Sequence, residues 1–207
     1  MVDPKHKLSL RSIRLEALGD GVFSVAMTVL VIELELPTIK EPGWSGLLHA
    51  FHETWDGMLC YILSFIVLGI MWFGHRMMFE YIGRSNRYFI FLGVLFYMIV
   101  CLVPFSTRFL AHHIFQWYAI FVYALNLSLC NISLYCQWLY GINRPSLLER
   151  ELPHEVKKEA KTLFLISPVV YSIAVIASFW MPQISIGIFI ITPVLYLLPN
   201  KLDKYMP

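Results

Sequence analysis

An aspartate, Asp20, lies inside the first long apolar stretch of the chain. This stretch runs from 14 to 37 and reads RLEALGDGVFSVAMTVLVIELELP, so Asp20 lies one to two helical turns from its start. A carboxylate at such a depth in a membrane is costly unless it is paired or wetted, which makes it a candidate for function. Arg14 in the same stretch, and Trp72 and His75 in the next one, are available at a similar depth. We therefore expect an inter-helix network of these four residues, which either holds the helices together or takes part in conduction.

A stripe of apolar and polar positions follows on the same stretch. Gly21, Val25, Thr28, Ile32 and Glu35 are spaced by four or three residues, so they share one face of a helix. Copies of this face around an axis would form a narrow pore. Rings of Val25 and Ile32 would exclude water, and Thr28 hydroxyls would replace part of an ion's hydration shell. Glu35 would attract cations at the outer mouth. The alternative is ordinary packing, with Thr28 bonded back to its own helix.

The elements that must position these residues are apolar helices. The chain has 207 residues, of which 58% are hydrophobic and 14% charged, against about 25% charged in soluble domains. A membrane-spanning helix needs about 20 mostly apolar residues. Six stretches qualify or nearly qualify: 14–36, 55–79, 88–108, 115–140, 161–181 and 183–199. We predict an all-α integral membrane protein with one six-helix domain over 1–207, a short interfacial turn near 45–52 and a charged connection over 143–160.

The basic residues predict how the spans are oriented. If the chain starts in the cytoplasm, only Lys40 and Arg108 of the 16 lysines and arginines fall on the outer side. This is the bias that the positive-inside rule requires, and it needs an even number of spans. We therefore expect both termini in the cytoplasm and a multi-pass protein of the cell membrane, in contact with lipid.

The sequence excludes several other classes. It contains no Walker motif, no His-Glu-x-x-His, no Gly-x-Ser-x-Gly and no dinucleotide fingerprint, and its loops are too short for a soluble catalytic domain. The four cysteines lie in apolar runs without a Cys-x-x-Cys pair. The sequence has no stretch of basic residues interleaved with aromatic residues that would indicate binding of nucleic acid. We expect no enzyme, no metal site, no cofactor and no nucleic-acid partner.

Two segments resemble the transmembrane protein 175 family of potassium channels. The run RLEALGD at 14–20, followed by an apolar helix with Thr28, resembles the family signature Arg-x-x-x-Phe-Ser-Asp in the first helix. The run WFGH at 72–75 is similar to the family's Trp-x-x-His. The chain departs from the signature at Leu18 and Gly19, where the family has Phe and Ser, so the packing around these positions must differ.

The resemblance implies a function and an assembly. It implies a potassium-preferring channel whose pore is lined by the first helix, about 14–36. It also implies a constriction at the positions of Val25 and Ile32, and a threonine layer at Thr28 that contributes to potassium preference. Because one such helix cannot enclose a pore, several copies are needed, and the family implies a homotetramer with K⁺ as the permeant ion.

A second hypothesis is a proton-coupled secondary transporter. In this reading Asp20 and His75 form a proton relay. The substrate path would follow a polar stripe in the fourth span, formed by Asn126, Cys130, Ser133 and Gln137. Hydrogen bonding between helices is the alternative explanation of that stripe.

Overall fold

The computed structural model describes residues 10–35, 37, 39, 43–150 and 153–197. The helices in this part are α1 (Ile13–Ile32), α2 (Trp44–Glu53), α3 (Trp55–Tyr81), α4 (Arg87–Val100), α5 (Val103–His112), α6 (Trp117–Ile142), α7 (His154–Ser178) and α8 (Pro182–Leu197). Two short strands, β1 (Leu10–Arg11) and β2 (Arg84–Ser85), pair antiparallel.

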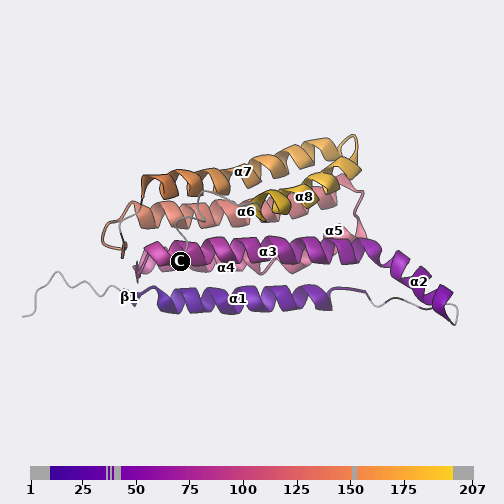
Figure 1. Ribbon diagram of the computed structural model, residues 1–207, viewed down its shortest axis with the longest axis horizontal. Coiled ribbons are helices and arrows are strands. Elements are labelled where there is room, and N and C mark those ends of the chain that lie inside the picture. Colours follow the sequence, from indigo (N-terminus) through magenta and orange to yellow (C-terminus); the bar gives the residue numbers. More distant parts are fainter. Residues whose placement is uncertain (1–9, 36, 38, 40–42, 151–152, 198–207) are drawn as a thin grey trace, which may run out of the picture.

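The long helices lie side by side in one bundle. In Figure 1, α1 forms one edge, α3 and α4 lie next to it, α6 follows, and α7 forms the opposite edge, while α2 projects beyond one end. Five segments of the described chain are long and apolar enough to cross a membrane, with α4 and α5 together forming the third. The predicted all-α membrane fold is therefore confirmed. The predicted sixth span is α8, which has 16 residues and extends about 24 Å at 1.5 Å per residue.

The two ends of the bundle differ in charge. We call the end where α1 and α7 begin and α3 and α6 finish the basic end. Every lysine and arginine of the described chain lies there except Arg108, which is on α5 at the opposite end. The alternation of basic segments predicted from the sequence is thus present in three dimensions. Lys5, Lys7, Lys40, Lys201 and Lys204, which also entered that prediction, lie outside the described residues.

Two predicted boundaries were wrong, and one predicted span contains a break. The first helix ends at Ile32 rather than at 36, because the residues that follow turn toward α5, where Glu33 pairs with Arg108. The third span is interrupted between α4 and α5, since Pro104 has no N–H to donate to a carbonyl of the preceding turn. The fifth begins at His154 rather than at 161, so much of the predicted charged connection forms the first turns of α7.

Polar contacts fix the start of α1 against the link between α3 and α4. Beyond the β1–β2 pair, the Ser12 hydroxyl donates to the carbonyl of Ile82 at 2.8 Å. The Ser12 N–H donates to the carbonyl of Gly83 at 3.2 Å. In the same link, Asn86 caps α4 by accepting a hydrogen bond from the N–H of Phe89 at 2.9 Å. These bonds fix the position of the start of α1 relative to the link between α3 and α4.

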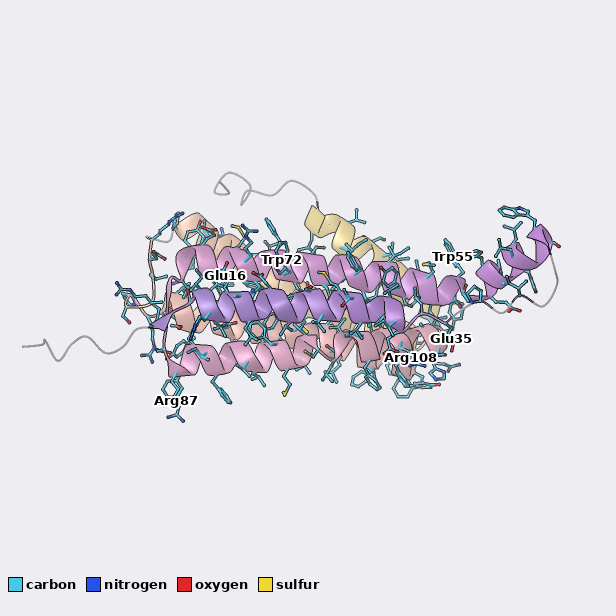
Figure 2. All side chains as sticks on the ribbon, turned by 90° about the horizontal axis from the view of Figure 1, so that it is seen from below. Glu16, Glu35, Trp55, Trp72, Arg87 and Arg108 are labelled. Carbon is cyan, nitrogen blue, oxygen red and sulfur yellow. The ribbon has the colours of Figure 1, made fainter. Side chains whose placement is uncertain are left out.

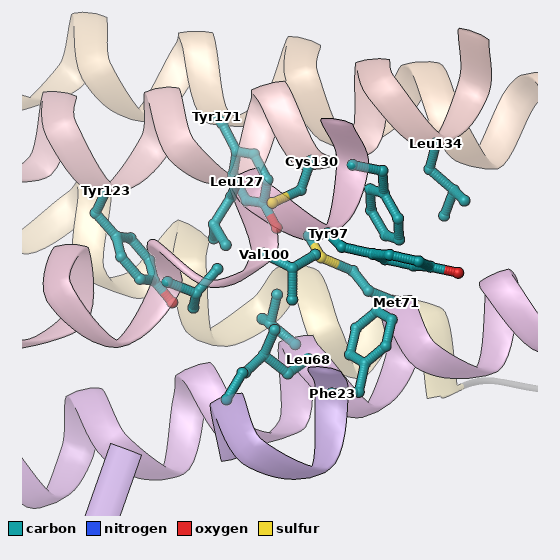
Figure 3. Packing of buried hydrophobic residues seen from close by; sticks show 14 of the residues in the cluster. Phe23, Leu68, Met71, Tyr97, Val100, Tyr123, Leu127, Cys130, Leu134 and Tyr171 are labelled. Carbon is teal, nitrogen blue, oxygen red and sulfur yellow. The ribbon is translucent and has the colours of Figure 1, made fainter. Parts of the chain in front are cut away.

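The core lies where α3, α4, α5 and α6 meet. Figure 3 shows Phe23 of α1 in the same packed region as Leu68 and Met71 of α3. Phe23 is only 1% exposed, so one face of α1 is firmly seated in this core.

Candidate pore face

Helix α1 is packed on one face and bare on the other. It packs on α3, α4 and α5. Its buried residues recur every three or four positions and are Leu15, Gly19, Phe23, Ala26 and Leu30. Figure 2 looks directly onto α1, and no other helix covers the side turned to the viewer. The helical part of the predicted stripe is exposed, since Gly21, Val25, Thr28 and Ile32 are all accessible, whereas Glu35 is exposed beyond the end of α1 and is not on its face.

The chemistry of this face changes from one turn to the next. The side chains of Val25 and Ile32 are 61% and 75% exposed, with Thr28 between them. The Thr28 hydroxyl donates to the carbonyl of Val25 at 2.8 Å. Because its proton is used within the helix, the hydroxyl oxygen offers lone pairs to its surroundings, which suits a cation and not an anion. Sequence reasoning missed Leu18, which is 51% exposed and extends the face by one turn toward the basic end.

The exposed face of α4 provides a comparison. Beyond Arg87, its exposed residues are all large and apolar: Tyr88, Phe91, Val94, Leu95 and Met98. Such a face suits contact with lipid. The exposed face of α1 instead includes a glycine at 21 and hydroxyls at Ser24 and Thr28. The composition of the two exposed faces therefore indicates that α1 and α4 face different surroundings.

Beside the bare face, α1 is tied to α3 by its acidic residue. The indole N–H of Trp72 donates to a carboxylate oxygen of Asp20 at 2.8 Å. The guanidinium carbon of Arg76 lies 5.9 Å from the centre of the Trp72 ring, in a cation–π arrangement. Arg14, which was expected in the same network, is exposed and has no hydrogen-bond or ion-pair partner among the described residues.

A second tie lies deeper and involves a residue that the sequence did not single out. The Tyr97 hydroxyl of α4 donates to the carbonyl of Leu15 at 2.7 Å. Because this uses its only proton, its contact with His75 Nε2 at 2.9 Å must be a bond that His75 donates. Tyr97 therefore joins α3, α4 and α1 at one point. Asp20 and His75 have separate partners, so these bonds do not connect them as the relay of a transporter requires.

Gly19 makes this arrangement possible. A Cβ atom at this position would lie 2.5 Å from Cε1 of His75 and 2.7 Å from the Tyr97 hydroxyl oxygen. Both rings are buried, so neither can move aside easily. The departure from the serine of the family signature is therefore explained by the packing of His75 and Tyr97 against the backbone of α1.

At the opposite end of α1, carboxylates surround a cleft. Glu33 binds Arg108 at 2.8 Å, and Glu35 lies 3.5 Å from His112. The cleft has a volume of about 440 Å³ and is also lined by Glu53 and Asp56. The side chain of Glu35 is 67% exposed, so its charge remains accessible.

The polar stripe of the predicted fourth span lies inside the subunit on α6. Asn126, Ser133 and Gln137 are buried, and the Cys130 thiol donates weakly to the Asn126 side chain at 3.6 Å. This stripe faces the protein interior and does not extend the exposed face of α1. Within the described residues, no group of histidine, cysteine, aspartate and glutamate side chains could hold a metal ion.

Together, the apolar bundle and the bare, polar-marked helix define a multi-pass membrane protein with the features of a channel subunit. Comparison with known proteins shows which channels the chain is similar to. The model of the endosomal/lysosomal potassium channel TMEM175 matches residues 14–104. A potassium channel of Streptomyces collinus is 38% identical over 121 residues, which cover 58% of each chain.

A second relative matches along almost the whole chain. The potassium channel of Chamaesiphon minutus is 29% identical over 192 residues, covering 91% of this chain and 94% of its own. The crystal structure of a TMEM175 homologue from Chamaesiphon minutus superimposes with a TM-score of 0.77 at 28% identity, covering 90% of this chain and 96% of that one. The chain is therefore similar to ion channels of the TMEM175 family over most of its length, as its resemblance implied. These similar proteins are named as channels, which agrees with a membrane location and with a role other than that of an enzyme.

Proposed function

We propose that this chain is the subunit of a potassium-preferring cation channel, lined by the exposed face of α1 in each of four identical copies. The observation that carries the proposal is that α1 buries one face in its own subunit and leaves Val25, Thr28 and Ile32 bare. Both bacterial relatives described above are named potassium channels, which favours K⁺ as the permeant ion. The proposal includes no cofactor and takes K⁺ as the permeant ion.

In such an assembly, the positions on α1 have separate tasks. Rings of Val25 and Ile32 form a hydrophobic constriction that gates by dewetting. Between them, a ring of Thr28 hydroxyl oxygens replaces part of the water around the ion. Glu35 raises the local concentration of cations at the mouth. The network of Asp20, Trp72, His75 and Tyr97 holds α1 in place and does not itself contact the ion.

We further propose that the whole chain, 1–207, is one channel domain with six spans and both termini in the cytoplasm. The separation of charge between the two ends of the bundle supports this orientation. It places the basic end inside and the carboxylate-lined cleft outside. The short α8 is the sixth span in this arrangement.

A flux assay in liposomes tests the proposal. Purified protein should pass K⁺ faster than Na⁺ down its gradient, without a coupled solute. Ile32→Asn should increase the K⁺ flux, because an amide ring would wet the constriction. Met98→Asn is the matched control, since Met98 is 58% exposed on the wholly apolar face of α4. Equal flux in wild type and Ile32→Asn, or an equal increase in the control, would contradict the pore-lining role of α1.

A further inference from the structure

On the side of the subunit away from α1, four helices enclose a cavity. It lies between α3, α6, α7 and α8 and has a volume of about 170 Å³. An apolar cavity of about 150 Å³ in another protein stays dry and binds benzene. Most of the residues that line this one are apolar or aromatic, among them Met71, Met78, Leu134, Phe164 and Pro193. The space therefore suits part of a hydrocarbon chain better than water.

The cavity exists because α8 is short. Helix α7 packs mainly on α6 and α8, whereas α3 packs mainly on α1 and α5 and touches α8 and α6 less. Helix α8 extends about 24 Å from its 16 residues, less than the roughly 30 Å of a hydrocarbon core. Figure 1 shows α8 beside only one half of α7. Where α8 finishes, near Pro193 and Tyr196, the space between α3 and α7 stays unfilled.

One polar group in the lining has no partner. Trp138 lines the cavity and is 3% exposed, and its indole N–H has no hydrogen-bond acceptor among the described residues. Leaving a buried donor unsatisfied is unfavourable. Trp138 lies four residues before the end of α6 at Ile142, which is about 6 Å from the basic end. Tryptophan is enriched at this depth, close to the lipid headgroups. A lipid ester carbonyl is available there as an acceptor.

Two lysines of α7 lie beside residues that line the cavity at this end. Val156 and Ala160 of α7 line the cavity. The next residue after each is an exposed lysine, Lys157 and Lys161. Basic side chains at this level attract the headgroups of anionic lipids. These exposed lysines therefore suit an anionic headgroup, and the apolar interior suits its acyl chain.

We propose that this cavity is a binding site for an anionic phospholipid of the leaflet at the basic end. One acyl chain fills the space between α3 and α7 beyond the end of α8. An ester carbonyl accepts the hydrogen bond from Trp138, and the headgroup lies near Lys157 and Lys161. Each copy of the chain carries its own lipid site. The proposal does not depend on which ion crosses the membrane.

Fluorescence quenching tests the site. The protein is placed in vesicles of phosphatidylcholine that contain either brominated phosphatidylglycerol or brominated phosphatidylcholine at equal bromine content. We expect stronger quenching by the anionic lipid in the wild type, and loss of this difference in Trp138→Phe. Lys157→Gln with Lys161→Gln should also remove the preference. Equal quenching by the two lipids in the wild type, or an unchanged difference in Trp138→Phe, would overturn the proposal.

Native mass spectrometry gives a second measurement on the same protein. After mild detergent washing, the wild type should retain one phosphatidylglycerol per subunit. Ala160→Phe should lose it, because the ring fills the cavity. Val169→Phe should keep it, since Val169 is on the same helix but is 60% exposed and outside the lining. If a variant ending at Leu197 gains a lipid that the full chain lacks, the end of the chain is the occupant and the proposal is wrong.

Discussion

The hydroxyl of Tyr97 is the most direct point at which to test how α1 is held. Tyr97→Phe removes a single oxygen, which accepts from His75 and donates to the Leu15 carbonyl. The carbonyl keeps its place in the helix, but the His75 N–H stays in a side chain that is 0% exposed. An unsatisfied buried donor costs about 1–3 kcal/mol, while hydrogen bonds inside membrane proteins average about 0.6 kcal/mol and reach about 1.7. We therefore expect a loss of about 1–2 kcal/mol.

The measurement is thermal unfolding in detergent, followed by the loss of monodisperse protein. At about 2–4 °C per kcal/mol for a chain of this size, Tyr97→Phe should lower the midpoint by about 2–8 °C. Tyr88→Phe is the matched control, since Tyr88 is on the same helix and 69% exposed. If both variants have the same unfolding midpoint, the Tyr97 hydroxyl does not hold α1 in place. Gly19→Ala should be at least as damaging, because its Cβ would meet both rings. Gly187→Ala, where nothing lies within 4 Å, should be tolerated.

Three further changes test other parts of the molecule. Thr28→Val should shift the reversal potential between K⁺ and Na⁺ toward zero while Thr28→Ser should not, and identical potentials in all three proteins would exclude a threonine layer. Trp72→Phe should cost about 0.5–1.5 kcal/mol by removing the donor to Asp20. Combining it with Asp20→Asn should cost less than the sum of the two, and full additivity would show that the bond does not matter. Arg108→Gln should cost only about 0.2–1 kcal/mol, because both partners of its pair with Glu33 are partly exposed. The difference in stability between Arg108→Gln and the wild type should disappear when thermal unfolding is measured at 1 M salt.

Much of the fold could be predicted because hydropathy and charge are local signals. The spacing of the α1 stripe depends only on helix geometry, and the four of its residues that lie within α1 are all exposed, whereas Glu35 lies beyond the end of the helix. The pairing of Asp20 with Trp72 followed from the expectation that both lie at the same depth. The early end of α1 could not be predicted, because it depends on Arg108, which is 75 residues away from Glu33.

Tyr97 had no signal in the sequence. It is one of 11 tyrosines, and its two partners lie 22 and 82 residues away. Nothing in composition or periodicity distinguishes it from a tyrosine that packs against lipid. Gly19 was visible as a departure from the family signature, but its cause became clear only when the rings of His75 and Tyr97 were placed against it. Such contacts depend on tertiary packing, which local patterns do not encode.

The way α1 is supported divides the chain into two parts under different constraints. Its packing partners are α3, α4 and α5, and α6 to α8 lie behind them. A substitution in α1 to α5 changes the position of the exposed stripe directly, whereas one in α6 to α8 must first deform a helix of the middle layer. Substitutions in the second part that keep its volume therefore affect the stripe only indirectly. The match to the family model follows the same division, since it ends at residue 104, within α5.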